Sequence, residues 1–180
     1  MKIALFGATG AVGGYFLNKA LAAGHEVTAL VRSPEKLGAQ PNLRAVKGDV
    51  TDTSDVQSVI NQTDVVVSCL GNVKGVMIME RAAEAILQAA AAQSNPPKCL
   101  FVSSIGCGDA RIAREANVPY VLIRPAALKE KPGNGKYRVF QGDGTFARPM
   151  AKEDVAAFLF DAVESEKWDG RGGFQLAGCK

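Results

Sequence analysis

Three glycines, spaced three residues apart at positions 7, 10 and 13, constrain the fold of this chain more than any other feature. The residues before Gly7 form a short apolar run, Ile3-Ala-Leu-Phe6, of the kind found in buried strands. After the glycines the spacing becomes helical and continues to Gly24, and glycine is a common residue at the end of a helix. The first 24 residues are therefore predicted to form a strand, a tight turn and a helix.

Such a glycine turn is suited to hold a pyrophosphate. Gly7 lets the chain reverse, Gly10 lets backbone N–H groups approach phosphate oxygens, and Gly13 lets the helix pack close to the strand. The helix also presents the positive end of its dipole to the same place. Because glycine spacing alone arises by chance, it is the flanking strand and helix that favour a dinucleotide site over a plain turn.

Apolar runs alternate with helical segments along the whole chain, which is the pattern of a parallel sheet covered on both faces. We predict an α/β fold with one doubly wound parallel sheet of Rossmann type, formed as a single domain over residues 1–180. The expected strands are residues 2–6, 26–31, 43–47, 65–69, 99–103, 120–123 and 173–176. The expected helices are residues 11–23, 54–60, 75–92, 109–116 and 152–165. Residues 126–149, rich in Gly, Pro and Lys, are predicted to form a long loop.

The composition argues against several classes of protein. The net charge of +3 is small and scattered along the sequence, and no basic run suggests a nucleic-acid surface. The longest apolar stretch, residues 82–92, is interrupted by Glu84 and Gln88, and Met1 leads directly into a strand, so neither a membrane span nor a signal peptide is expected. Four cysteines without a C-x-x-C pair and one histidine support no metal site or disulfide framework. We therefore expect a cytoplasmic protein that binds no nucleic acid, membrane or metal.

The carboxyl ends of parallel strands meet at one edge of an open sheet, where ligands bind, so the residues after each strand form the candidate site. The second strand ends at Arg32, about twenty residues after the glycine turn, where an acidic residue would bind the ribose hydroxyls of NAD. A guanidinium instead matches a 2′-phosphate. Arg32 therefore favours NADP(H), the alternative being an arginine that is only solvated.

Other strand ends carry residues suited to the rest of a dinucleotide. After the third strand, Asp49 can accept a hydrogen bond from an adenine amino group while Val50 packs on the ring. After the fourth, Gly71 permits a close backbone approach to a ribose. The fifth strand ends in two hydroxyls, Ser103 and Ser104, of which at most one faces the cleft.

These motifs, taken in order, resemble a known superfamily. GATGAVGG at 7–14, VRS at 31–33, GDV at 48–50, SSIG at 103–106, IRP at 123–125 and EDVAA at 153–157 are similar to atypical short-chain dehydrogenases/reductases. In particular, they resemble the NAD(P)H-binding group of NmrA-like regulators and biliverdin reductase B-type flavin reductases. The resemblance covers nearly the whole chain. It implies that the cofactor is bound by Gly7, Thr9, Gly10, Ala11, Val12, Arg32, Asp49, Val50, Leu70, Gly71, Ser103 and Pro125.

Two departures from the superfamily bear on the reaction. Ordinary members carry Tyr-x-x-x-Lys on the helix after the fifth strand, where the tyrosine protonates a carbonyl, and this chain has no such pair between residues 105 and 118. The one literal match, Tyr15 to Lys19, lies on the first helix and cannot reach a hydride acceptor. The segment 108–118 is also shorter than the family's long helix and substrate loop, which often build a dimer interface. We expect a monomer or weak homodimer.

Three functions fit these residues. The first is an NADPH-dependent reductase that transfers a hydride to a flat, electron-poor small molecule such as a flavin, quinone or tetrapyrrole, since this needs mainly stacking and orientation. Its proton would come from solvent or from Ser104, the candidate catalytic residue, unless that hydroxyl only bonds backbone; Cys107 is a more remote candidate. The second is a non-catalytic NADP(H)-binding sensor or regulatory protein. The third, an epimerase with tightly held NAD, conflicts with Arg32 and the missing tyrosine–lysine pair.

Overall fold

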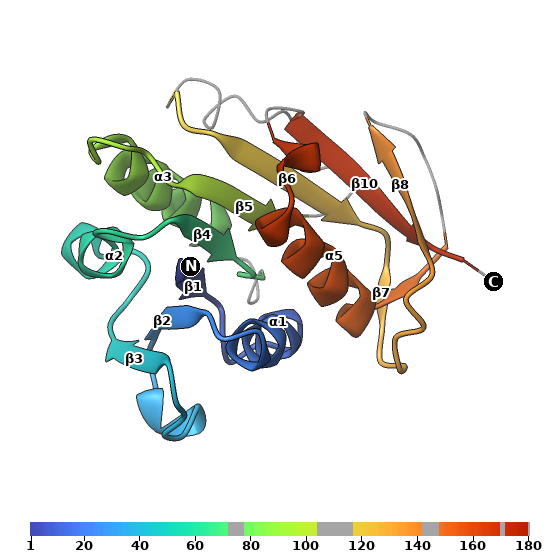
Figure 1. The fold of residues 1–180 in the computed structure, drawn as a ribbon, viewed down its shortest axis with the longest axis horizontal. Helices are drawn as coiled ribbons and strands as arrows, with labels where there is room; N and C mark the ends of the chain where they lie inside the picture. The colour runs from blue at the N-terminus through green and yellow to red at the C-terminus, as the bar shows by residue number, and fades with distance from the viewer. Residues whose placement is uncertain (72–77, 104–116, 142–147, 170–171, 180) are drawn as a thin grey trace.

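One large twisted sheet organises the molecule (Figure 1). The computed structural model describes residues 1–71, 78–103, 117–141, 148–169 and 172–179. The sheet has eight strands in the order β3-β2-β1-β4-β5-β6-β10-β8. Its strands are β1 (Lys2–Phe6), β2 (Glu26–Val31), β3 (Leu43–Lys47), β4 (Val65–Ser68), β5 (Lys98–Val102), β6 (Tyr120–Pro125), β8 (Tyr137–Gln141) and β10 (Gly172–Gly178).

Every neighbouring pair in this sheet is parallel except β10 and β8, which are antiparallel. The strand order reverses at β1: β2 and β3 lie on one side of it, and β4, β5 and β6 lie on the other. The connections leaving β1 and β4 therefore diverge, and at such a point ligands of open α/β sheets bind beyond the carboxyl ends of the strands. The expected α/β fold of Rossmann type is confirmed.

Helices cover both faces of the sheet. α1 (Ala11–Ala22) and α5 (Lys152–Glu164) lie side by side on one face, and α2 (Thr53–Ile60) and α3 (Ile78–Ala91) lie on the other (Figure 1). Alternate residues of β1 divide between the two layers: Ile3 and Leu5 pack with α1 and α5, whereas Ala4 and Phe6 pack with α2 and α3. Strands buried on both faces are continuously apolar, which is why the sequence pattern identified them. Two short 3₁₀ helices, η1 (Pro34–Lys36) and η2 (Glu166–Trp168), complete the connections.

The predicted element bounds agree closely with the structure. The first three strands have the predicted bounds, and the later ones differ by one or two residues at an end. The predicted helices 11–23, 54–60 and 152–165 agree to within one residue at each end. In the described part of the chain, the third predicted helix runs over Ile78–Ala91, and the predicted helix 109–116 lies outside the described residues.

The prediction of a long loop over residues 126–149 is wrong. This stretch contains β8 and also β7 (Leu128–Lys129), which pairs with β9 (Met150–Ala151) in a small second sheet. β8 is an antiparallel edge strand, so the sheet is mostly, not wholly, parallel. Tyr137 and Val139 of β8 pack against the core while Arg138 is exposed, but this alternation is only five residues long. Flanking Gly, Pro and Lys residues hide so short a signal in the sequence.

Candidate functional site

The turn after β1 leaves room for glycine alone at two places. Gly7 has a φ of +85°, and a Cβ on it would lie 2.7 Å from the carbonyl oxygen of Cys69. A Cβ on Gly13 would lie 2.1 Å from the carbonyl oxygen of Gly7. Both contacts are with backbone, which cannot move aside, so α1 and the end of β4 meet this turn closely. The structure thus brings the predicted glycine residues together in one compact cradle.

The amino end of α1 is open toward the outside of this cradle. Gly10 caps the helix without a side-chain hydrogen bond, and the first turn contains no acidic residue. Thr9, Gly10 and Ala11 are exposed, whereas Val12 points into the core. Because the first N–H groups of a helix have no partner within it, those of α1 are available to an anion. This geometry suits a phosphate group.

Arg32 and Asp49 lie close together at the ends of β2 and β3. The Gly48 N–H donates to the carbonyl oxygen of Val31 at 3.1 Å, which holds the two strand ends side by side. Asp49 Oδ1 accepts hydrogen bonds from the N–H and the hydroxyl of Thr51, at 2.8 and 2.7 Å. These bonds, with a smaller contribution from the Arg32 charge, hold the pKa of Asp49 below its usual value. Asp49 is therefore an ionised acceptor at the predicted adenine position, with Arg32 exposed beside it.

Asp55, which the sequence analysis did not identify, orients this turn. Its Oδ2 atom accepts the Asp49 N–H at 2.9 Å from the first turn of α2. The same oxygen occupies the place that a Cβ on Gly48 would need, at 2.6 Å. Asp52 caps α2 by accepting from the N–H groups of Ser54 and Asp55. The Asp52-x-x-Asp55 spacing resembles a capping box, and this was the signal that could have identified Asp55.

The remaining predicted residues lie along the ends of β4, β5 and β6. Leu70 is half-buried against the core beside α2 and α3. A Cβ on Gly71 would meet no described atom within 4 Å, so the fold itself does not require glycine there. Ser103 follows β5 and donates its N–H to the carbonyl oxygen of Ile123 at 2.8 Å. Pro125 ends β6 in a buried position, and the Val50 side chain packs partly against the core near α2.

Ser104 and Cys107 lie outside the described residues. Cys69, which directly follows β4, is not an alternative nucleophile, because burial raises the pKa of its thiol to about 12. Among the described residues, no group of three or more His, Cys, Asp or Glu side chains could hold a metal ion. In the same part of the chain, no helix is long and apolar enough to cross a membrane.

The EDVAA motif at 153–157 begins α5 and holds the segment that follows β6. Glu153 accepts the Gly133 N–H at 2.9 Å. Asp154, which is only 3% exposed, accepts the N–H groups of Asn134 and Gly135 at 3.0 and 2.9 Å. An ion pair between Lys152 and Glu130 adds to this contact. The two carboxylates therefore face inward and fix the connection between β7 and β8 against the start of α5.

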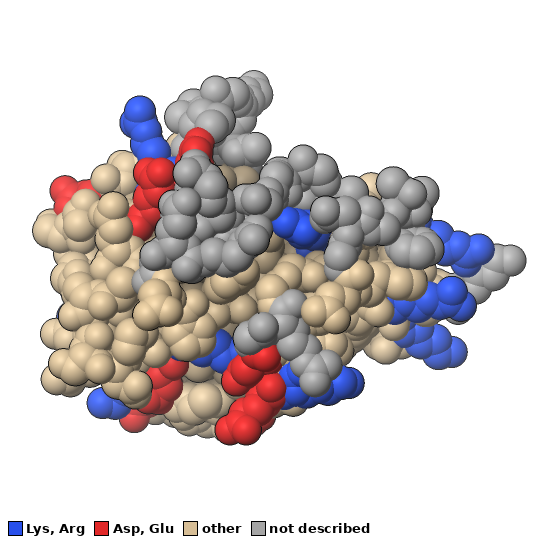
Figure 2. Space-filling model, turned by 90° about the horizontal axis from the view of Figure 1, so that it is seen from above, with Lys and Arg blue, Asp and Glu red and all other residues tan. Residues whose placement is uncertain are grey.

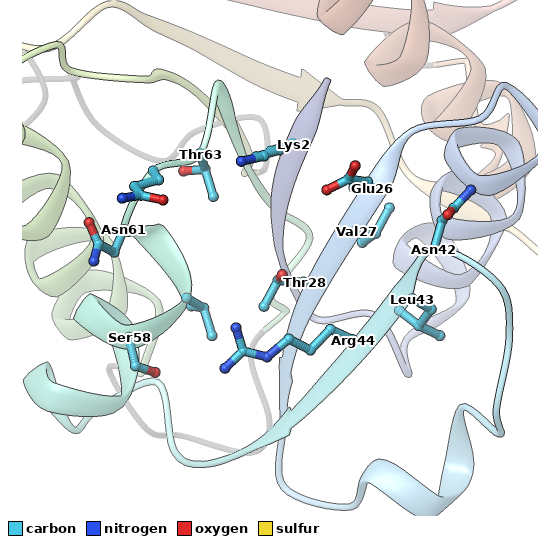
Figure 3. Close-up of a pocket in the computed structure, with 12 residues that line it drawn as sticks. Lys2, Glu26, Val27, Thr28, Asn42, Leu43, Arg44, Ser58, Asn61 and Thr63 are labelled. Carbon is cyan, nitrogen blue, oxygen red and sulfur yellow. The ribbon is translucent and has the colours of Figure 1, made fainter.

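A polar hollow of about 440 Å³ lies at the opposite, amino-terminal ends of β1, β2 and β3 (Figure 3). Figure 3 shows Arg44 reaching from β3 toward the helix that carries Ser58, with Thr28 of β2 nearby. α2 is only eight residues long, so it leaves these polar strand residues uncovered. None of the predicted site residues lines this hollow.

We predict opposite effects for alanine at two adjacent glycines of α1. Gly13→Ala should lower the melting temperature and abolish dinucleotide binding, because the new methyl group would collide with the Gly7 carbonyl. Gly14→Ala is the matched control: its Cβ would lie 3.6 Å from the Ala8 carbonyl oxygen, an ordinary contact. That variant should gain up to about 1 kcal/mol from helix propensity. Thermal unfolding and calorimetric titration measure both effects, and an unchanged Gly13→Ala variant would contradict the described turn.

Removing the Asp55 carboxylate should loosen the predicted adenine end of the site. Asp55→Ala is expected to raise the Kd of NADPH and NADH by the same factor, roughly 10- to 100-fold, since a hydrogen bond to a charged group contributes about 1.5–3 kcal/mol. Asp64→Ala is the control, because Asp64 also accepts a backbone N–H, that of Lys2, but at the amino-terminal edge. Equal affinities for Asp55→Ala and Asp64→Ala would show that the turn needs no support from Asp55.

Comparisons with known proteins agree with this arrangement. The structure is similar to a Rossmann-fold NAD(P)-binding family protein from Shigella flexneri, with a TM-score of 0.81, 21% identity, and 98% of this chain and 93% of that one covered. It is also similar to ChuY, an anaerobilin reductase from Escherichia coli O157:H7, with a TM-score of 0.83, 22% identity and coverage of 99% and 97%. A Streptococcus pneumoniae TIGR4 protein named as a candidate NADH-flavin reductase has a TM-score of 0.78, 19% identity and coverage of 99% and 100%. At such identities these likenesses show the shared fold.

A match to a protein family indicates which kind of ligand the chain binds. Residues 7–166 match a family described as NAD(P)H-binding, and this span contains the glycine turn, every other predicted cofactor residue and the start of α5. The match covers most of the 180 residues. The chain therefore belongs to the NAD(P)H-binding family.

Proposed function

We propose that the protein is an NADPH-dependent reductase that transfers a hydride to a flat, electron-poor acceptor such as a flavin, a quinone or a tetrapyrrole. The observation that carries the proposal is the row of residues along the carboxyl edge. The glycine cradle lies at the end of β1, Arg32 and Asp49 lie on one side of it, and Ser103 and Pro125 lie on the other. A dinucleotide bound along this row would have its adenosine over β2 and β3 and its nicotinamide toward β5 and β6.

The residues present fit the cofactor. A Cβ at Gly7 or Gly13 would collide with backbone atoms of the cradle, so only glycine leaves this space open. The exposed amino end of α1 offers N–H groups to the pyrophosphate. NADPH would supply the hydride, the acceptor would take it together with one proton, and NADP⁺ would leave. Asp49 would accept from the adenine amino group, and Thr51 and Asp55 hold it in position to do so.

Arg32 supports the choice of NADPH over NADH. Its guanidinium is exposed at the end of β2, and no described residue forms an ion pair with it. Asp49, whose carboxylate interacts electrostatically with Arg32, already accepts two hydrogen bonds from Thr51. A 2′-phosphate would find a free guanidinium with planar geometry.

The residues after the fifth strand favour a reaction that depends on orienting the acceptor against the nicotinamide. The sequence lacks a Tyr-x-x-x-Lys pair after the fifth strand, so no tyrosine there is available to protonate a carbonyl oxygen. Hydride transfer to a conjugated ring needs stacking against the nicotinamide, and solvent or Ser104 can supply the proton. Two structural relatives carry the names of reductases, one of anaerobilin and one of flavin, which agrees with such an acceptor.

The proposal is tested by mixing the protein with NADPH and, in turn, a flavin and a quinone while absorbance of the reduced nicotinamide is followed. We expect oxidation of NADPH that depends on both protein and acceptor, and slower oxidation of NADH. NADPH-selective binding without oxidation by any acceptor would favour the alternative, a non-catalytic NADP(H) sensor. Failure to bind either nucleotide would overturn both functions.

Arg32→Ala should separate the two nucleotides. We expect its Kd for NADPH to rise roughly 10- to 100-fold, because a charge-assisted hydrogen bond contributes about 1.5–3 kcal/mol, while its Kd for NADH stays unchanged. Arg44→Ala, which removes an exposed arginine at the amino-terminal edge, is the control and should affect neither nucleotide. Calorimetric titration gives all four constants. An equal loss for NADPH and NADH would show that Arg32 does not recognise the 2′-phosphate.

A further inference from the structure

The positive charge of this protein is concentrated in one segment. Residues 129–152 contain six Lys or Arg and two Asp or Glu, whereas the rest of the chain contains slightly more acidic than basic residues. The net charge of +3 therefore arises entirely from these 24 residues. Four of these cations, Lys129, Lys131, Lys136 and Arg138, lie in the stretch predicted as a loop, where exposed lysines are ordinarily only solvated.

The fold places this segment at the carboxyl edge, beyond β6. It begins just after Pro125, and the Met150 N–H donates to the carbonyl oxygen of Ala127. The carbonyl oxygen of Arg148 accepts the N–H of Gly178, and that of Lys136 accepts the N–H of Cys179. Because β10 is parallel to β6, these bonds attach the segment to the carboxyl end of β10, next to that of β6 (Figure 1). The basic segment therefore lies on the nicotinamide side of the proposed site, away from Arg32.

The cations of the segment are available to a ligand. The exposed residues are Lys129, Lys131, Lys136, Arg138 and Arg148, and none of them forms an ion pair with a described residue. Three acidic groups near them in the described part of the chain are already engaged: Glu130 pairs with Lys152, and Glu153 and Asp154 accept backbone N–H groups from residues 133–135. In Figure 2, Lys and Arg side chains gather at the end of the molecule where Figure 1 places β8 and the C-terminus, and the described residues drawn around them on this face include no Asp or Glu.

We propose that the hydride acceptor carries an anionic group, a phosphate or carboxylate set apart from its conjugated ring, and that residues 129–138 recognise it. This inference rests on the proposed reductase function and names the substrate class of the same site. The ring stacks at the ends of β5 and β6, and the anionic group extends over β7 and the start of β8. Exposed cations around a binding edge attract an anion over several ångströms, which raises the rate of encounter and orients the acceptor.

The test compares riboflavin with flavin mononucleotide, which have the same isoalloxazine ring and differ by one phosphate. At low ionic strength, kcat/KM with NADPH should be roughly 10-fold higher for the mononucleotide, and the difference should shrink as salt screens the charges. The double variants Lys129→Ala/Lys131→Ala and Lys136→Ala/Arg138→Ala should lower kcat/KM for the mononucleotide and leave riboflavin and the Kd of NADPH unchanged. The control Arg44→Ala/Arg81→Ala removes the same charge from exposed positions elsewhere and should keep the wild-type ratio.

The outcomes separate the inference from the proposed function. Equal kcat/KM for the two flavins at all salt concentrations would overturn the inference and leave the reductase standing. If the double variants instead prefer NADPH over NADH less strongly than the wild type does, the segment contacts the cofactor. This result would also overturn the inference. If neither flavin oxidises NADPH, the fluorescence of each flavin is titrated in the presence of NADP⁺. Tighter binding of the mononucleotide, lost in the double variants, would then support the anion site while the reductase function fails, and equal binding would overturn both.

Discussion

The close contact between the backbones of β1, β4 and α1 is the constraint on which the rest of the structure depends. The Gly7 carbonyl meets Gly13 of the helix, and the Gly7 α-carbon meets the Cys69 carbonyl at the end of β4. Only hydrogen atoms fit between these backbone groups. The contact places the amino end of α1 over the point where the strand order reverses, so one steric requirement produces both the packing of the helix on the sheet and the opening for a pyrophosphate.

The carboxylates near the candidate cofactor site accept hydrogen bonds from neighbouring residues of the protein. An anionic dinucleotide would be repelled by free acidic side chains, yet Asp49 and Asp55 both lie at the predicted adenine end. Asp55 accepts the N–H of Asp49, and Asp49 accepts the N–H and hydroxyl of Thr51, so both charges are neutralised in part by local donors. Arg32 stays exposed beside them. The predicted adenosine end therefore combines a hydrogen-bonded turn that would face the base with an exposed cation that would face a phosphate.

The last third of the chain builds the other half of the edge as one connected unit. β7 pairs with β9, β8 pairs with β10, and the first two carboxylates of α5 bind the turn between β7 and β8. α5 itself packs against α1, which carries the glycine cradle. The segment beside the proposed acceptor is therefore tied through α5 to the cofactor end. This arrangement suits a reaction that depends on the relative placement of two ligands and not on a strong acid supplied by the protein.

The sequence by itself determined the Rossmann-type fold, because buried parallel strands are continuously apolar and the glycine turn allows few alternatives. It also determined which residues follow each strand, since that depends only on strand bounds, and Arg32, Asp49, Ser103 and Pro125 lie where the strand ends predict. Only the tertiary structure decided the features in which residues from different helices, strands and turns contact one another. Examples are the support of Asp49 by Asp55, the inward bonds of Glu153 and Asp154, and the edge strand β8 within a stretch that local patterns assign to a loop. The placement of the basic segment at the carboxyl edge was also decided there, because residues 136–138 reach the end of β10 only when β8 pairs with it.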